Sequence, residues 1–288
     1  MGCSKSSLVF GAQIDTHKEV SGLGAMLFKR FVEWNKSICD RIEMMLPGEF
    51  TRSLLYLHER TVVAAMTGRR SQTVVDIGGG HFSPFAKHRD PKLGTRLVAI
   101  DILVEQIKKN TFADFGVVAD VGQSIPLKDG SVDIIVTRSV LEHLEDNRDF
   151  FSECLRVLKD GGTCFHVFPC RFALFALINQ IIPNAVANKL LFSLFPEWRE
   201  RCGFRAYYHN CYSRSMIKRQ LSAGLSIKEV YYRYYQAIYF KFFIPFYLLV
   251  TFYDLILYYM NLRPLAAQMF LIVAKPEGLP VAAPTAEG

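Results

Sequence analysis

The feature that most constrains this chain is the run from Val74 to Gly80, VVDIGGG. An apolar run that ends in an acid and then glycines is typical of a buried strand that breaks into a tight turn. Glycine lets the backbone approach a ligand where a Cβ atom would collide with it. Asp101 follows about 20 residues later, at the end of a second apolar run, where a carboxylate suits a ribose diol. These residues predict a site for a cofactor that contains a nucleoside.

Strand and helix signals alternate along the chain after residue 70. Short apolar runs predict strands, and turn residues or helical patterns separate them. The predicted strands cover residues 73–76, 96–100, 117–119, 132–136, 163–168, 227–234 and 269–274. Such alternation is typical of a mostly parallel sheet covered by helices on both faces, so an α/β fold is expected.

Helical patterns lie before, between and after these strands. An amphipathic helix is predicted over 25–46, and Pro47 ends it. Ser139 and Glu142 have the spacing of a capping box, which predicts a short helix there, and another is predicted to start at Ser83. The remaining predicted helices cover residues 50–66, 104–110, 148–158, much of 172–195, and 216–223; a loop is predicted over 197–212.

This organisation divides the chain into parts with different expected roles. The predicted parts are a disordered tail (1–22), N-terminal helices that cap the fold (23–70), a cofactor-binding core (71–170), a helical cap on the acceptor side (171–226), the final strands (227–277), and a second disordered tail (278–288). Within the final strands, the apolar stretch 239–260 is predicted to be an interfacial insertion before the last strand.

Charge and cysteine content bound the partners and the compartment. The net charge of +7 favours an anionic partner, either nucleic acid or a membrane surface. Aromatic residues, 13% of the chain, concentrate after residue 165, which favours the membrane. The seven cysteines form no C-x-x-C pair and lie beside no histidine cluster, so no metal site is expected. With no secretory signal, a cytoplasmic location peripheral to a membrane is predicted.

The first residues, Met1 to Ser6, match the pattern for N-myristoylation. In a eukaryotic cell, Gly2 would carry the myristoyl chain and Cys3 could carry a second acyl chain. One myristoyl chain alone gives only marginal membrane binding, so Cys3 matters to this prediction. In any other cell the pattern has no meaning, and the segment is an unmodified tail.

Five segments in order resemble the class I S-adenosylmethionine-dependent methyltransferases, whose fold is Rossmann-like. They are the glycine motif at 75–80, the second-strand motif at 99–102, a segment similar to LPFPDGSFD at 125–133, an S-x-L-E-H turn at 139–143, and an end of helix similar to R-V-L-K-P-G-G at 156–162. The chain is most similar to the group that includes quinone-biosynthesis and other small-molecule or lipid methyltransferases. Two positions depart from the pattern, because Phe82 stands for a further glycine and Asp160 for proline.

The resemblance implies S-adenosylmethionine as the cofactor and a set of binding residues. Asp76 would hold the amino group of the cofactor, Asp101 the ribose hydroxyls and Asp120 the adenine amino group. The complete expected set is Asp76, Gly78, Gly80, Asp101, Ile102, Asp120, Val121 and Ser139.

His143 is the candidate general base, because the ordinary pKa of histidine lies near neutrality and the residue follows the fourth strand. The alternative is that the Glu142–His143 pair only shapes the cofactor pocket. Tyr207, Tyr208 and His209 are candidate acceptor-binding residues, with a packed surface loop as the alternative. Cys170 follows a proline, as in cytosine-C5 methyltransferases, but it follows the wrong strand and is interpreted as a coincidence.

The apolar run 242–253 is too short to span a bilayer, which needs about 20 residues. If the strands on either side pair in one sheet, both ends of the run lie on the same side of any membrane. With 172–195 and the basic helix 25–46, the run could form an apolar lip around the acceptor site. A dimer interface or a small extra core remains the alternative, and a homo-oligomer is left open.

The favoured hypothesis is methyl transfer to a small apolar or lipid-linked acceptor at a membrane surface. The charge also suits an RNA or DNA methyltransferase, but the segment 137–140 lacks the N/D-P-P-Y pattern of such enzymes. A nicotinamide oxidoreductase nearly fits Gly78, Gly80 and Ser83, but Asp76 and the Glu-His turn speak against it. A non-catalytic, cofactor-binding assembly protein on a membrane stays open, since methyl transfer has no obligatory catalytic residue.

Overall fold

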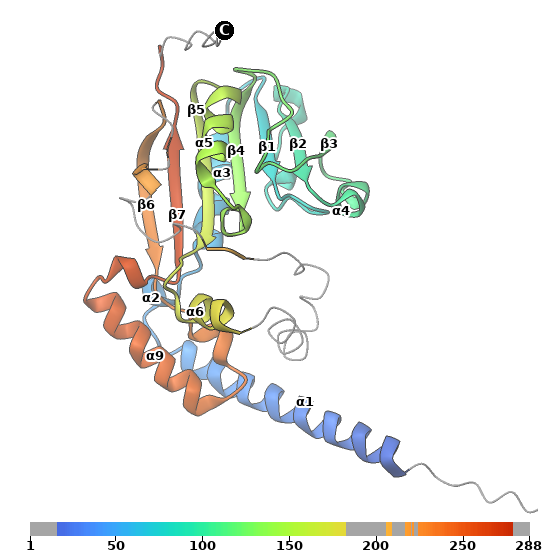
Figure 1. Cartoon of the computed structure of the whole chain (residues 1–288), viewed down its shortest axis with the longest axis vertical. Helices are drawn as coiled ribbons and strands as arrows, with labels where there is room; N and C mark the ends of the chain where they lie inside the picture. The colour runs from blue at the N-terminus through green and yellow to red at the C-terminus, as the bar shows by residue number, and fades with distance from the viewer. Residues whose placement is uncertain (1–15, 183–205, 209–216, 220, 222–223, 279–288) are drawn as a thin grey trace, which may run out of the picture.

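The computed structural model describes residues 16–182, 206–208, 217–219, 221 and 224–278. At its centre is a seven-stranded sheet in the order β3-β2-β1-β4-β5-β7-β6 (Figure 1). The strands are β1 (Thr73–Ile77), β2 (Arg96–Asp101), β3 (Phe115–Val118), β4 (Val132–Arg138), β5 (Leu158–Pro169), β6 (Ser226–Arg233) and β7 (Gln268–Ala274). β7 runs antiparallel to β5 and β6, and the other neighbours are parallel. The predicted α/β fold with a mostly parallel sheet is confirmed.

Helices cover both faces of this sheet. α3 (Leu54–Met66) packs on one face and α5 (Asn147–Val157) on the other, while α4 (Val104–Lys109) lies along β2 and β3. Successive residues of β1 point to opposite faces, so Val74 joins the core beneath α3 and Val75 joins the core beneath α5. The remaining short elements around this core are the 3₁₀ helices η1 (Ala86–His88), η2 (Pro91–Leu93) and η3 (Leu141–His143).

Three local predictions are wrong. The helix predicted over 50–66 is two helices, α2 (Gly48–Thr51) and α3, because Arg52 and Ser53 are extended and the Ser53 hydroxyl accepts from Leu55 N to cap α3. No helix starts at Ser83; the nearest one, η1, begins at Ala86. Ser139 does not cap η3 either, since its φ is +56° and the helix begins two residues later.

The N-terminal helix is longer than predicted. α1 (Thr16–Glu43) begins at Thr16 rather than at residue 25, so residues 16–22 of the predicted tail are helical. Figure 1 shows α1 extending well beyond the body of the protein. The predicted tail 278–288 lies outside the described residues after Gly278, as do half of the predicted helix 216–223 and most of the loop 197–212; residues 217–219 are helical.

The apolar helices lie where the parallel strands of the sheet have their carboxyl ends. α6 (Leu174–Ile181) follows the end of β5, and α9 (Ile244–Tyr259), flanked by the 3₁₀ helices η5 (Ala237–Phe240) and η6 (Arg263–Leu265), joins β6 to β7. Gln268 pairs with both Pro169 and Arg233, so β6 ends and β7 begins where the parallel strand β5 ends. The connection that carries α9 therefore leaves from the carboxyl edge of the parallel strands and returns to it (Figure 1).

α1 and α9 pack together beneath this edge. Ile244 N donates to Asn35 Oδ1 at 3.0 Å, and Lys241 forms ion pairs with Asp40 and Glu43 of α1. Their facing sides enclose a core of their own, which contains Cys39, Phe50, Tyr235, Ala237, Phe240, Tyr247 and Val250. Part of the apolar insertion thus packs as an extra core. Across the described parts of the chain, no helix has both the length and the hydropathy that a membrane span requires.

Candidate functional site

The turn after β1 is as tight as its glycines suggest. Gly78 N donates to Ile100 O of the neighbouring strand at 2.7 Å, and the φ angles of Gly78 and Gly80 are +72° and +48°. A Cβ atom on Gly78 would stand 2.6 Å from Val140 Cγ2, and one on Gly79 would stand 2.6 Å from Asp76 Oδ2. The turn therefore packs tightly between β2, the end of β4 and the Asp76 carboxylate, and it has no room for side chains at Gly78 and Gly79.

We expect Gly78→Ala to destabilise the protein by about 2–4 kcal/mol, because it adds a clash with Val140 to the strain of a left-handed residue. Gly130 is the matched control, since its φ is +58° and a Cβ atom there would meet nothing within 4 Å. Gly130→Ala should cost only about 1–2 kcal/mol. Urea unfolding of both variants measures the difference, and equal losses would contradict the packing described for this turn.

Asp101 closes the second side of the turn. Its Oδ2 accepts from Gly80 N at 3.1 Å, and its Oδ1 accepts from Leu103 N at 2.9 Å. A Cβ atom on Gly80 would lie 3.6 Å from Asp101 Oδ2 and from Gln106 Oε1, so the space above Gly80 is bordered by acceptor oxygens. Asp101 is partly exposed, and each carboxylate oxygen can accept a second hydrogen bond. The arrangement suits a ligand that offers paired hydroxyl donors.

Asp76 is buried beneath the turn, with 3% of its surface exposed. Burial raises the pKa of its carboxyl to about 7, although the Ser83 hydroxyl, which donates to Oδ2, and the charge of Arg138 act in the opposite direction. Sequence reasoning assigned Ser83 to a helix start and missed its contact with Asp76. The only sequence signal for that contact is a small hydroxyl residue shortly after the glycines, which is weak.

The ends of β2 and β3 are held together by a bond from Ala119 N to Asp101 O at 3.1 Å. Asp120 follows on the surface, where its carboxylate accepts from Gly122 N at 3.0 Å and from Gln123 Nε2 at 3.1 Å. Val121 is buried, whereas Ile102, next to Asp101, is 48% exposed. These predicted residues therefore lie at two neighbouring strand ends, with Ile102 as an exposed apolar side chain beside Asp101.

The end of β4 supplies the remaining candidates. Ser139 is exposed, and its strained backbone is held by a bond from its N–H to Val167 O at 2.9 Å. His143 ends η3 and is half-buried. Glu142 is buried, and Oε2 of its carboxyl has no hydrogen-bond partner among the described residues. Burial raises the pKa of Glu142 to about 8, with the Ser139 hydroxyl as an opposing influence.

Two of the three predicted acceptor residues lie beside this turn. The backbone N–H groups of Tyr207 and Tyr208 donate to Glu142 O at 2.7 and 3.1 Å. The Tyr207 hydroxyl donates to Glu145 Oε1 at 2.9 Å, and Tyr208 is buried. His209 lies outside the described residues. The structure thus brings the two tyrosines to the Glu142–His143 turn, which the sequence separates from them by more than sixty residues.

The predicted cofactor residues and His143 all lie at or just after the carboxyl ends of β1, β2, β3 and β4, which are neighbours in the sheet. In open α/β sheets ligands bind at this edge. The described residues contain no group of three or more histidine, cysteine or acidic side chains placed to hold a metal ion. Cys170, whose match to the cytosine-C5 methyltransferases is interpreted as a coincidence, is fully buried in the main core.

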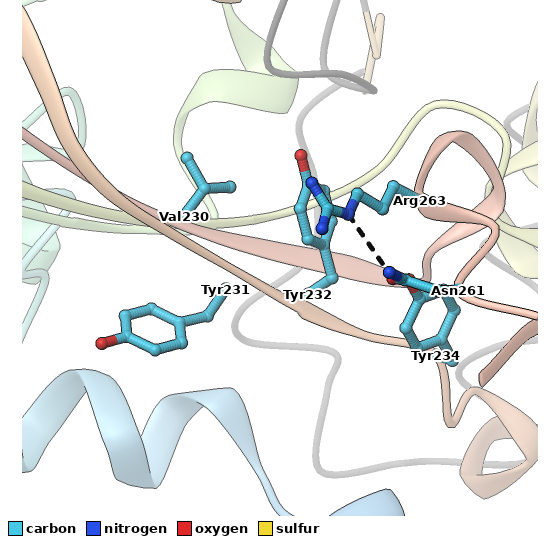
Figure 2. A pocket seen from close by; sticks show the side chains of 6 residues that line it. All are labelled: Val230, Tyr231, Tyr232, Tyr234, Asn261 and Arg263. Carbon is cyan, nitrogen blue, oxygen red and sulfur yellow. Dashed lines mark hydrogen bonds between the residues drawn. The ribbon is translucent and has the colours of Figure 1, made fainter. Parts of the chain in front are cut away.

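A separate cavity of about 370 Å³ lies beside the edge strand β6 and the 3₁₀ helix η6. It is lined by Val230, Tyr231, Tyr232, Tyr234, Asn261 and Arg263. Figure 2 shows the Arg263 guanidinium against the Tyr232 ring, 5.8 Å from its centroid, with Arg263 Nε donating to Asn261 Oδ1 at 3.5 Å. Because β4, β5 and β7 separate β6 from β1, this cavity is distinct from the glycine turn.

The family described as "Methyltransferase domain" matches residues 75–166, the part of the chain that contains the glycine turn and the Glu142–His143 turn. A Mycolicibacterium smegmatis protein named "Probable S-adenosylmethionine-dependent methyltransferase" is 55% identical over 38 residues, which are 13% of this chain and 15% of that protein. An uncharacterized methyltransferase of Mycobacterium sp. (strain KMS) is 32% identical over 101 residues, 34% of this chain and 39% of that protein. The chain spans less than half the length of these curated relatives.

Among solved structures, the chain resembles the geranyl diphosphate C-methyltransferase of Streptomyces coelicolor A3(2), solved with Mg²⁺, geranyl diphosphate and S-adenosyl-L-homocysteine. The identity is 14%, the TM-score is 0.48, and the match covers 76% of this chain and 78% of that one.

Proposed function

We propose that this chain, whose residues 75–166 are a class I S-adenosylmethionine-dependent methyltransferase domain, methylates a small apolar or lipid-linked acceptor at a membrane surface in the cytoplasm. One observation carries the acceptor class. The apolar helices α6 and α9 are placed by the sheet topology at the same carboxyl edge as the glycine turn. An acceptor that reaches this edge therefore approaches past apolar surface.

The residues at the edge fit the cofactor. Asp101 retains acceptor capacity beside the open space above Gly80, which suits the ribose hydroxyls, and the Asp76 carboxylate suits an ammonium group. Asp120 and Val121 would meet the adenine, with Gly78, Ile102 and Ser139 completing the lining. When bound, S-adenosylmethionine supplies an electrophilic methyl group on a sulfonium. The protein's own part is to orient the acceptor and to take up a proton where the acceptor loses one.

Asp76 predicts the pH dependence of cofactor binding. Burial raises its pKa to about 7, so the carboxyl is protonated below that pH and must lose a proton to hold an ammonium group. We expect the affinity for S-adenosylmethionine to fall by about tenfold per pH unit below pH 7 and to level off above it. Calorimetric titration between pH 5.5 and 8.5 measures this, and Asp76→Asn should remove most of the dependence. An affinity that rises toward low pH would contradict the assignment.

We assign the proton-accepting role to His143 and a positioning role to Glu142. With a pKa of about 8, Glu142 is mostly protonated at neutral pH and is a poor base there. Its backbone oxygen instead holds Tyr207 and Tyr208 at the turn. The half-buried His143 is the adjacent side chain with the chemistry to accept a proton at neutral pH. The two tyrosines, with His209, are proposed to border the acceptor.

The decisive experiment supplies purified protein with methyl-labelled S-adenosylmethionine and an extract of its host, followed by partition into organic solvent, nucleic acid and protein. Label in the organic phase supports the proposal, and its loss in His143→Gln with cofactor affinity unchanged supports the base. Label in nucleic acid overturns the acceptor class and makes the positive charge the main clue. No label in any fraction, with the cofactor bound, overturns the enzymatic role in favour of a binding protein.

A further inference from the structure

The outward side of α9 is an uninterrupted apolar surface. Leu249 and Phe252 are each 63% exposed, and the same side carries Leu248, Ile256 and Tyr259. Successive members of this set are three or four residues apart, or adjacent, so they share one side of the helix. The single charged residue of α9, Asp254, points the other way and is fully buried. Nothing in the described part of the protein covers this side, and contiguous exposed apolar surface of this kind is typical of an interaction site.

α1 carries a second exposed apolar stripe at the same end of the molecule (Figure 1). Leu27, Phe31 and Trp34 are all exposed and recur at helical spacing. This stripe is separate from the buried side of the helix, where Val32, Asn35 and Cys39 pack toward η5 and α9. The two helices therefore present apolar surface outward while their facing sides are fixed to each other.

Exposed arginines lie on α1 and shortly after α9. On α1, Arg30 and Arg41 flank the stripe, and neither forms an ion pair with an acid among the described residues. The acids of this helix whose side chains are described already form ion pairs, Glu33 with Lys29, and Asp40 and Glu43 with Lys241. Arg263 is exposed four residues after the end of α9, and it lines the cavity shown in Figure 2.

We propose that the end of the protein formed by α1 and α9 docks on an anionic lipid bilayer, with α9 lying in the interfacial plane. A second copy would bring arginines against arginines, whereas anionic headgroups neutralise them. Trp34 and Tyr259 suit the boundary between headgroups and acyl chains. The pairing of Arg233 with Gln268 returns both ends of the α9 connection to one sheet edge, which fits a helix that lies on a bilayer rather than one that crosses it.

This inference rests on the proposed function and deepens it. It places the carboxyl ends of the parallel strands, where the candidate site lies, toward the bilayer. Vesicle binding requires neither cofactor nor methyl transfer, so its outcome is independent of the activity assay. The full chain is co-sedimented with two kinds of vesicle. One is phosphatidylcholine alone, and the other contains about 30% phosphatidylglycerol, an anionic lipid that attracts basic surfaces.

Leu249→Glu together with Phe252→Glu should weaken binding to the anionic vesicles by roughly a hundredfold or more, since two buried apolar side chains are lost. Phe115→Glu on β3 is the matched control, because Phe115 is 56% exposed at the far edge of the sheet, and it should bind as the unmodified protein does. Arg30→Gln and Arg263→Gln should each weaken binding by roughly fivefold on anionic vesicles only. Melting curves establish that each variant is folded.

Three results would overturn the proposal. The first is no sedimentation with either vesicle, and the second is equal binding to neutral and anionic vesicles with Arg30→Gln unchanged. The third is a concentration-dependent dimer, seen by light scattering, that Leu249→Glu and Phe252→Glu dissociate while vesicle binding is absent. That last result would assign the apolar surface to a second copy of the chain.

Discussion

Replacing Asp101 with alanine should weaken S-adenosylmethionine binding by about 10²–10⁴-fold and reduce methyl transfer in parallel at limiting cofactor. The proposed bonds to the two ribose hydroxyls are charge-assisted, and each is worth about 1.5–3 kcal/mol. The same carboxylate also accepts from Gly80 N and Leu103 N, so the alanine variant loosens the glycine turn as well. Direct titration with S-adenosylmethionine measures the affinity.

Two further variants separate binding from folding. Asp101→Asn keeps the shape and one acceptor oxygen, and we expect a smaller loss of about 10–100-fold. Asp149→Ala, an exposed acid on α5, should leave affinity unchanged. If folded Asp101→Ala binds S-adenosylmethionine with an affinity within about threefold of that of the unmodified protein, Asp101 does not hold the ribose and the ribose site lies elsewhere.

Asp254 predicts the largest loss of stability. Its buried carboxylate accepts from Gln236 N at 2.7 Å, from Ala237 N at 2.9 Å and from Gln236 Nε2 at 3.0 Å. The Gln236 side chain in turn accepts from Phe175 N, which ties α6 to α9 through η5. Asp254→Ala would leave three buried donors without a partner, and we expect it to destabilise the protein by about 3–5 kcal/mol in urea unfolding.

Leu248→Ala, on the exposed side of the same helix, is the control and should change stability by less than about 0.5 kcal/mol. Asp254→Asn adds a test by pH. Burial raises the pKa of Asp254 to about 7 from 3.8, so the folded protein takes up a proton between pH 7 and 4 that the unfolded chain does not. The free energy of unfolding of the unmodified protein, relative to that of the asparagine variant, should therefore rise by up to about 1.4 kcal/mol per pH unit as the pH falls through this window. A constant difference would mean that Asp254 stays ionised.

The sheet and the edge that carries the site could be predicted because their signals are local. Buried parallel strands are short apolar runs, and an acid or glycines at their ends are visible without knowledge of packing. Every predicted strand is present, with shifted ends. β5 starts at Leu158 rather than at residue 163, because Leu158 already pairs with Val132 of β4. The register then shifts before the next pair, Ile134 with Thr163. Such an irregularity has no local signature.

The polar contacts could not be predicted because they join distant residues. Asp254 follows an apolar run in the sequence, and only the fold brings the start of η5 to its carboxylate. Ser139 matched a capping box by spacing, yet the bond from its N–H to Val167 O of β5 holds it in a left-handed conformation outside the helix. Spacing along one segment predicts helix starts well only where no neighbouring strand competes for the same N–H.

The position of α9 has a consequence for how such a protein can diversify. The helix is inserted between two antiparallel strands whose ends, Arg233 and Gln268, are paired, so a tight hairpin could replace the whole segment without moving any other strand. The proposed cofactor residues lie at the ends of β1 to β4 and share no loop with it. Under the proposed function, exchange of this one connection between homologous chains would keep the methyl donor and change whether the acceptor is taken from a bilayer or from solution.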